Sequence, residues 1–381
     1  MKSLQLATLF LEQNLKGRYV TNEHIKPLLD KLPKSFLVSS EGKSVLGKDI
    51  YSVKFGIGKT KILAWSQMHG NESTTTKALF DLFNYLSSDD NTVKDIYNKF
   101  TFYCIPILNP DGAAAYTRVN ANEIDLNRDS FAITQPESKL LRTIFEAYKP
   151  NYCFNLHDQR TIFGTEANLP ATVSFLAPAF NEARDYNETR LKAIRIINAM
   201  NDKLQQIIPN QVGRFDDSFN INCTGDYFTY ANTPTILFEA GHFKDDYDRD
   251  EVRKFIFISL FTALTENYEN VIVSNDLDKY LKISQNLKNF NDFIYKNVII
   301  FDNSDEKIIN FAAQFTEILY QDKIHFEAHI VSIEDLNAFN GHYEFDAKGE
   351  EFNASYGKFP KIGEKASFKI GNNYNFSNGK Q

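Results

Sequence analysis

Short apolar runs alternate with segments of helical spacing from about residue 35 to residue 270. The runs have the length of buried strands, whereas the other segments repeat apolar residues at every third or fourth position. The predicted strands are residues 36–39, 50–55, 61–66, 100–108, 152–156, 172–176 and 235–238. The predicted helices are residues 73–86, 136–148, 182–208 and 249–264. We therefore expect an α/β fold in which a mixed, largely parallel twisted sheet is flanked by helices.

The pattern changes after about residue 275, where β-branched and aromatic residues gather and helical spacing becomes weak. The predicted strands of this part are residues 297–301, 315–319, 324–330 and 366–370. We interpret residues 1–275 as one large domain and residues 276–381 as a small β-rich accessory domain with a helical lead-in. The last ten residues are rich in Asn and Gly, and we expect them to fray.

Composition is that of a globular protein, with 43% hydrophobic and 24% charged residues among 381. A formal net charge of -7 argues against nucleic-acid partners and against binding to anionic membranes. The N-terminal apolar segment has no small-residue cleavage site after it, and the longest apolar stretch, residues 255–264, is too short to span a bilayer. Cys104, Cys153 and Cys223 form no CxxC pair, which favours a reducing compartment. We therefore expect a cytoplasmic protein, and its oligomeric state is left open.

Three candidate metal ligands follow two of the predicted strands. His69 and Glu72 lie three positions apart in a tight turn, which Gly70 allows to close without a clashing side chain. His157 follows a second strand, and ligands of open α/β sheets bind outside the carboxyl ends of the strands. Imidazole and carboxylate suit zinc, and two His with one Glu leave a fourth position open. Asp158, next in the chain, is either a supporting partner of this site or a turn residue.

Further polar residues follow other apolar runs. Glu239 ends one such run, where a poorly solvated carboxylate has a raised pKa that suits a general base. Arg118, Asn127 and Arg128 come after the turn Asn109-Pro110-Asp111-Gly112. Arginine pairs with carboxylates through its planar fork, so these side chains are candidates for binding an anionic substrate end and a developing oxyanion. Taken alone, each arginine favours a solvated surface loop with a few ion pairs.

Taken together, these motifs resemble the zinc metallocarboxypeptidase family of the carboxypeptidase A/B/D type. Their order is HxxE, Asn-Pro-Asp-Gly, Arg, Asp-Leu-Asn-Arg, His and a strand-end Glu, and it covers about residues 35–270. Residues 44–50, Ser-Val-Leu-Gly-Lys-Asp-Ile, are similar to the start of the family's catalytic domain. Each motif is modest alone, but their occurrence in this order is specific.

The resemblance implies a zinc hydrolase that cleaves the amide bond next to a free C-terminal carboxylate, using water activated by zinc. It implies one Zn²⁺ per chain, and a peptide or an acylated amino acid as substrate. The implied metal ligands are His69, Glu72 and His157. The implied catalytic residues are Glu239 as general base and Arg118 as the oxyanion partner. The implied substrate-binding residues are Asn127 and Arg128, at the terminal carboxylate.

Two positions depart from the family pattern. Familiar members carry a mobile Tyr ahead of the base, whereas the matching residues 217–222 contain none, and Tyr227 and Tyr230 lie off position. The residues near Thr224 and Gly225, where the family has the floor of its side-chain pocket, carry no charge. A strict preference for a basic terminal residue is therefore not expected.

A related family offers the alternative function. Zinc deacylases of the aspartoacylase and succinylglutamate desuccinylase type share the HxxE, the Asn-Arg pair, the later His and the strand-end Glu, and they carry a β-rich C-terminal extension. They release an amine from an N-acyl amino acid. Residues 44–50 and 109–112 favour the carboxypeptidase branch. A non-catalytic binding scaffold is disfavoured, because the base and all three ligands are present.

Overall fold

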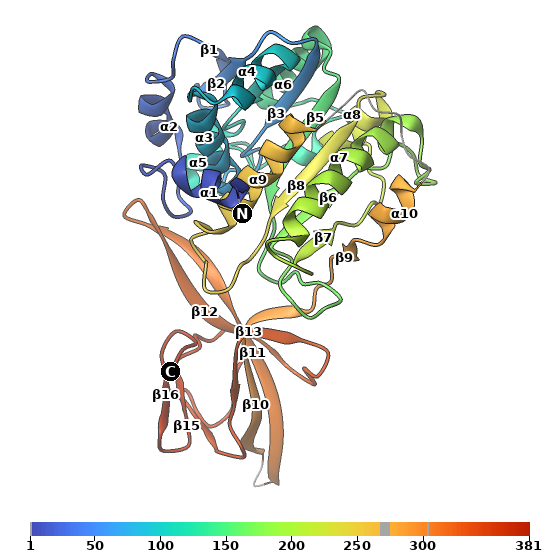
Figure 1. Cartoon of the computed structure of the whole chain (residues 1–381). Helices are drawn as coiled ribbons and strands as arrows, with labels where there is room; N and C mark the ends of the chain where they lie inside the picture. Colours follow the sequence, from blue (N-terminus) through green and yellow to red (C-terminus); the bar gives the residue numbers. More distant parts are fainter. Residues whose placement is uncertain (1, 267–274, 303–304) are drawn as a thin grey trace. The chain divides into compact units, whose positions relative to one another are not determined.

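The computed structural model of the chain describes residues 2–266, 275–302 and 305–381, and Figure 1 shows its elements in the order of the sequence. The chain divides into two compact units. The first extends to Gln159 and continues over Thr165–Asn286, and the second consists of Arg160–Gly164 and Leu287–Gln381. The domain boundary predicted after residue 275 stays a prediction.

The first unit is built on a sheet that has nine strands in the described chain, in the order β1-β2-β4-β3-β5-β8-β6-β7-β9. The strands β4, β3, β5 and β8 are mutually parallel, as are β6, β7 and β9. Antiparallel pairs join β1 to β2, β2 to β4 and β8 to β6. The strands are β1 (Phe36–Lys43), β2 (Asp49–Phe55), β3 (Thr60–Trp65), β4 (Phe100–Ile105), β5 (Tyr152–Asp158), β6 (Val173–Leu176), β7 (Val212–Arg214), β8 (Thr235–Ala240) and β9 (Ser284–Gln285). The predicted mixed, largely parallel sheet is confirmed.

Helices connect these strands. They are α1 (Lys2–Leu9), α2 (Asn22–Leu29), α3 (Thr74–Leu86), α4 (Asn91–Lys99), α5 (Pro110–Ala115), α6 (Pro136–Tyr148), α7 (Glu188–Gln205), α8 (Thr224–Tyr230), α9 (Val252–Thr265) and α10 (Asp276–Leu281), with a 3-10 turn, η1, at Leu126–Arg128. Helix α6 has the predicted bounds, whereas α7 begins six residues later than predicted, because the side chain of Asn187 accepts a hydrogen bond from Arg190 N and caps the helix there. In the described chain, no helix has both the length and the apolar character needed to cross a bilayer.

The central strands are buried on both faces, as parallel sheets require. On β3, Ile62 and Ala64 join the apolar cluster that also contains residues of α3, α7 and α9. Leu63 and Trp65 point the other way, into a cluster with residues of α6 and α8, where Trp65 meets Phe228 edge-on. Helices therefore cover both faces and leave the strand ends of the sheet available for polar side chains.

The second unit is β-rich, as predicted. In its described residues a four-stranded sheet has the order β12-β11-β10-β13, and a three-stranded sheet has the order β14-β15-β16. The strands are β10 (Phe290–Asp302), β11 (Asp305–Tyr320), β12 (Lys323–Ile333), β13 (Asn340–Asp346), β14 (Phe352–Asn353), β15 (Phe368–Ile370) and β16 (Tyr374–Phe376). The expected fraying of the last ten residues is wrong, because β16 pairs with β15 and the ring of Phe376 is buried against Tyr295 and Phe368. The predicted helical lead-in is α10, which lies in the first unit.

Candidate metal centre and active site

Three neighbouring parallel strands carry the candidate residues to one edge of the sheet. His69 lies four residues after β3 ends, His157 lies on β5 and Glu239 lies on β8. Residue pairing places Trp65 beside Asn155, and His157 beside Glu239. Because paired residues of parallel strands project to the same face, the side chain of Glu239 lies at the level of His157. The carboxyl ends of β3, β5 and β8 therefore form the frame of the site.

The turn after β3 is packed directly against α5. A Cβ on Gly70 would lie 1.9 Å from the carbonyl carbon of Gly112 and 2.2 Å from the nitrogen of Ala113. Asn109 secures the same contact, because its side chain donates to Met68 O at 3.2 Å and accepts from Gly112 N at 2.8 Å. The Asn-Pro-Asp-Gly motif is thus the surface on which the His69–Glu72 turn rests, and this close approach explains Gly70. A Cβ on Gly112 would instead lie 2.4 Å from Asn109 Nδ2 and 2.6 Å from Val119 O.

His69, Glu72 and His157 converge. His69 Nδ1 lies 2.9 Å from Glu72 Oε1, His157 Nδ1 lies 2.8 Å from Glu72 Oε2, and the two Nδ1 atoms are 3.1 Å apart. One ligand atom from each residue lies within 4.8 Å of those of the other two, and all three residues are buried. In the part of the chain that the structure describes, these residues form the group able to hold a metal ion.

The donor set fits zinc. Burial alone would raise the pKa of Glu72, but the neighbouring rings of His69 and His157 lower it well below its usual value. Burial lowers the pKa of His157 and so favours the neutral imidazole, the form that binds metal. Two imidazole nitrogens and one carboxylate, buried and facing a common point, match the two-His, one-Glu ligand set of catalytic zinc sites.

Asp125 supports this centre and was not assigned a role from the sequence. Its Oδ1 lies 3.0 Å from His69 Nε2 and accepts a hydrogen bond from Asn127 N at 2.9 Å. Burial would raise its pKa, but the contacts with His69 and the charge of Arg118 lower it, so Asp125 is ionised. A carboxylate on the far nitrogen of a ligating imidazole fixes the tautomer and the ring orientation. Its place in the Asp-Leu-Asn-Arg motif was the available signal.

Arg118 is the candidate that reaches the metal ligands directly. Its Nη1 lies 3.3 Å from Glu72 Oε1, and its Nε donates to Asp125 Oδ2 at 3.1 Å. The side chain is 47% exposed, so part of the guanidinium faces solvent beside the centre. A cation is thereby held next to the ligands with donors still available to an incoming group.

Asn127 and Arg128 lie beside α8. Asn127 Oδ1 accepts a hydrogen bond from Thr224 N at 2.9 Å, and Arg128 Nη1 donates to Cys223 Sγ at 3.2 Å. Arg128 is exposed. The structure thus ties both residues to the start of α8, while Asp125 ties their segment to His69.

Glu239 is buried beside the centre, and the structure gives its Oε2 no hydrogen-bond partner among the described residues. Burial raises the pKa of Glu239 well above its usual value, and the negative charges of Glu72 and Asp158 raise it further. Asp158 itself accepts from Thr74 N and Oγ1, and its own N–H donates to Glu72 Oε2 at 3.2 Å. Asp158 thus ends β5, its side chain holds the start of α3, and its backbone N–H contacts Glu72.

No tyrosine takes the place of the family's mobile one near residues 217–222. Tyr227 is held in place, because Arg142 Nη1 donates to its hydroxyl at 2.8 Å and the guanidinium carbon lies 3.6 Å from the centre of its ring. Tyr230 is 56% exposed at the end of α8.

The ionisation of Asp226, on α8, should make the stability of the fold depend on pH. Burial raises its pKa to about 7, so the charged form is disfavoured in the folded protein. Because the unfolded value is near 3.8, wild-type stability falls as the pH rises from about 4 to above 7. Asp226→Asn keeps an acceptor for Asn220 N and removes the charge. At pH 8 we expect it to raise the free energy of unfolding by at most about 4 kcal/mol, at roughly 1.4 kcal/mol for each pKa unit.

Urea denaturation at pH 4 and at pH 8 measures this effect. The two proteins should be equally stable at pH 4 and differ at pH 8. A difference that is the same at both values would mean that the ionisation of Asp226 does not affect the stability of the fold.

Comparison with known proteins agrees with this geometry. Residues 21–139 match the family model described as zinc carboxypeptidase, a stretch that contains His69, Glu72, Arg118, Asn127 and Arg128. Carboxypeptidase 2 of Trichophyton tonsurans is 24% identical over 100 residues, which are 26% of this chain and 19% of that protein. Carboxypeptidase SOL1 of Arabidopsis thaliana is 29% identical over 150 residues, 33% of this chain and 30% of that protein. The chain thus spans less than a third of the length of either relative.

Solved structures show the same fold. A metallo-carboxypeptidase from Burkholderia cenocepacia aligns with a TM-score of 0.52 at 19% identity, over 65% of this chain and 68% of its own. The carboxypeptidase A from Helicoverpa armigera aligns with a TM-score of 0.51 at 17% identity, over 69% of this chain and 80% of its own. Residues 21–139 thus match the zinc carboxypeptidase family, and the chain shares the fold of solved carboxypeptidases.

Proposed function

We propose that the chain is a zinc-dependent hydrolase that cleaves the amide bond next to a free C-terminal carboxylate of a peptide. The observation that carries the proposal is the convergence of His69, Glu72 and His157 beside a buried Glu239 whose Oε2 has no partner among the described residues. A catalytic zinc site needs three protein ligands, an open position and a nearby base, and these four residues supply the protein part.

Glu239 is the proposed general base. His69, Glu72 and His157 would hold the zinc ion, which supplies Lewis acidity that makes water a stronger acid and polarises the scissile carbonyl. Glu239 Oε2 would accept the proton from the attacking water and then deliver it to the leaving amine nitrogen. Burial and the neighbouring charges of Glu72 and Asp158 raise its pKa, which favours proton transfer in both directions near neutral pH.

Arg118 is the proposed oxyanion partner. Its guanidinium already lies within 3.3 Å of a ligand carboxylate and keeps exposed N–H groups, so a carbonyl oxygen beside the centre would find a charged donor. The two contacts to Glu72 and Asp125 hold the guanidinium before substrate arrives. Donors placed in advance at a developing negative charge lower the barrier most effectively.

Asn127 and Arg128 are the proposed partners of the terminal carboxylate. The side-chain oxygen of Asn127 accepts a hydrogen bond from Thr224 N, and the NH₂ group of Asn127 is left to donate to other acceptors. Arg128 presents an exposed planar guanidinium one residue further on. Together they supply neutral and charged donors on one short segment, which suits a substrate end that carries a full negative charge.

The alternative, an N-acyl amino acid deacylase, rests on the β-rich second unit. Such an enzyme would use the same ligands, base and arginines and would differ in substrate alone. The cytoplasmic location also stays a prediction.

The proposal is tested by pairing metal content with product analysis. We expect one zinc per chain and removal of single residues from peptides with a free C-terminus, read by mass spectrometry on a pool that also holds C-terminally amidated peptides and N-acyl amino acids. Arg128→Ala should raise KM for free-carboxylate peptides by roughly 10- to 100-fold, because it removes a charged hydrogen bond. Lys192→Ala, which removes an exposed cation from α7, is the control and should change nothing.

Other results of the zinc and product analysis would change the assignment. Consumption of N-acyl amino acids alone would move the assignment to the deacylase branch. Equal cleavage of amidated and free peptides would contradict the role of Arg128, and a chain without zinc under replete conditions would contradict the ligand assignment.

A further inference from the structure

The two proposed carboxylate-binding residues sit on a loop that is joined to the start of α8. We call residues 125–130 the clamp loop. Asn127 Oδ1 accepts from Thr224 N, Arg128 Nη1 donates to Cys223 Sγ, and Ser130 N donates to Asn222 O at 3.1 Å. The orientation of Asn127 and Arg128 therefore depends on how the clamp loop lies against α8.

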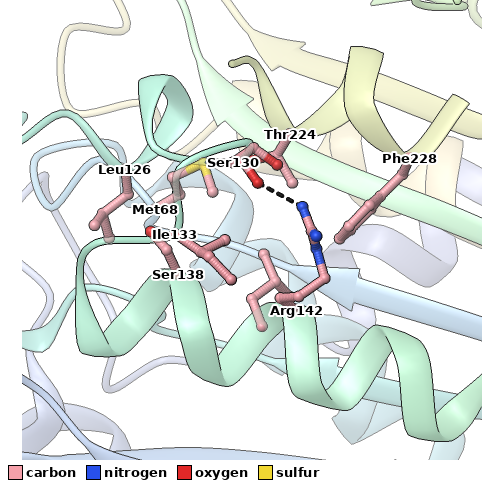
Figure 2. Close-up of a pocket in the computed structure, with 9 residues that line it drawn as sticks. Met68, Leu126, Ser130, Ile133, Ser138, Arg142, Thr224 and Phe228 are labelled. Carbon is pink, nitrogen blue, oxygen red and sulfur yellow. Dashed lines mark hydrogen bonds between the residues drawn. The ribbon is translucent and has the colours of Figure 1, made fainter. Parts of the chain in front are cut away.

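Arg142 contacts both the clamp loop and α8. It lies on α6, and its side chain is only 12% exposed. Its Nη2 donates to Ser130 O in the clamp loop, and its Nη1 donates to the hydroxyl of Tyr227 on α8, whose ring it also covers. Figure 2 shows the guanidinium extending from α6 toward Ser130 and Thr224. One largely buried cation thus connects the loop to the helix.

Packing around this connection is incomplete. A cavity of about 10 Å³ lies at the junction, and Figure 2 shows its lining residues, among them Met68, Leu126 and Thr224. This volume is about one water molecule. Arg142 therefore adds two hydrogen bonds beside this cavity to the direct bonds that join the clamp loop to the start of α8.

We propose that Arg142 is a positioning residue for the binding of the substrate carboxylate, an inference that rests on the function proposed above. It acts through Ser130 and Tyr227 and holds the clamp loop in the position at which Asn127 and Arg128 meet the same carboxylate. Loss of this connection lets the loop shift away from α8, and a displacement of about 1 Å is enough to cost up to roughly 100-fold in a well-aligned site. The effect falls on substrates with a free carboxylate.

Arg142→Met tests the proposal, because methionine keeps much of the side-chain volume and removes the donors. We expect KM for free-carboxylate peptides to rise roughly 10-fold or more, with kcat within about threefold of wild type and no change on any substrate without that carboxylate. Zinc content should be unchanged. Hydrogen exchange, followed by mass spectrometry, should become faster at Ser130 N, which donates to Asn222 O.

Matched variants separate positioning from general stability. Arg195→Met removes an arginine of similar exposure, 14%, from α7 and should leave KM and the exchange at the clamp loop unchanged. Tyr227→Phe keeps the ring and removes one acceptor, so it should raise KM less than Arg142→Met, and it serves if Arg142→Met does not fold. Arg142→Lys, which keeps a charged donor for Ser130 O, should recover part of the loss.

Three results would overturn the inference. These are unchanged KM and exchange in Arg142→Met, faster exchange spread over the whole first unit, or equal losses with free and amidated peptides. If the wild-type protein cleaves no free-carboxylate peptide, the proposed function fails, while the exchange at Ser130 still decides whether Arg142 holds the clamp loop.

Discussion

Glu239→Gln should remove nearly all turnover while leaving zinc bound. Glutamine keeps the volume and the position on β8, but it has no pKa at which it can accept a proton from water. The loss should be at least the ~10²- to 10⁴-fold contribution of general-base catalysis. Because burial disfavours the charged carboxylate, the neutral side chain should not lower the melting temperature. Steady-state kinetics, zinc analysis and thermal denaturation on one preparation measure all three quantities.

The control for this variant is Glu188→Gln, which neutralises an exposed carboxylate on α7 and should retain full activity. Turnover of Glu239→Gln at the wild-type rate would contradict the role of Glu239 as the base. Loss of zinc together with activity would instead make Glu239 part of the metal centre.

Glu72→Gln should release zinc. The substitution replaces a carboxylate that faces both His69 and His157 by a neutral amide that binds metal weakly. Removal of a supporting partner costs about 10- to 100-fold in metal affinity, so loss of a direct ligand should cost more than roughly 100-fold. Titration against a chelator of known affinity measures the change, and hydrolysis should disappear with the metal.

Asp125→Asn provides the graded comparison for that experiment. It weakens the support of His69 Nε2 without replacing a proposed ligand, so its zinc affinity should lie between those of the wild type and Glu72→Gln. Wild-type zinc affinity in Glu72→Gln would mean that zinc binds elsewhere.

Much of the fold could be predicted because its signals are local. Apolar runs of strand length gave the central strands, and the spacing of apolar residues gave α6 with its bounds. Helix α9 starts three residues later than predicted, because Arg249 has a positive φ of 59° that an α-helix does not allow. The end of the chain was predicted wrongly because Phe376 is ordered by distant partners, Tyr295 and Phe368, which composition does not reveal.

The candidate site divides in the same way. His69, Glu72 and His157 could be selected because each follows an apolar run, and the parallel sheet then brings their donor atoms together. Asp125 and Arg142 could not be assigned a role in this way. Their importance comes from contacts across 56 residues of sequence to His69 and 85 residues to Tyr227. The Asp-Leu-Asn-Arg motif marks Asp125, but no local pattern marks Arg142.

The contact between Gly70 and Gly112 has a consequence for metal exchange. Because the two backbones touch, the His69–Glu72 turn cannot swing open while α5 stays in place. Release of a bound ion would therefore require a local unfolding event in which α5 and its cap Asn109 move away from the turn. The residence time of the metal should then depend on how often that opening occurs, and not only on the affinity of the ligands for the metal. A variant with a loosened Asn-Pro-Asp-Gly segment would therefore exchange its metal ion faster, at nearly unchanged equilibrium affinity.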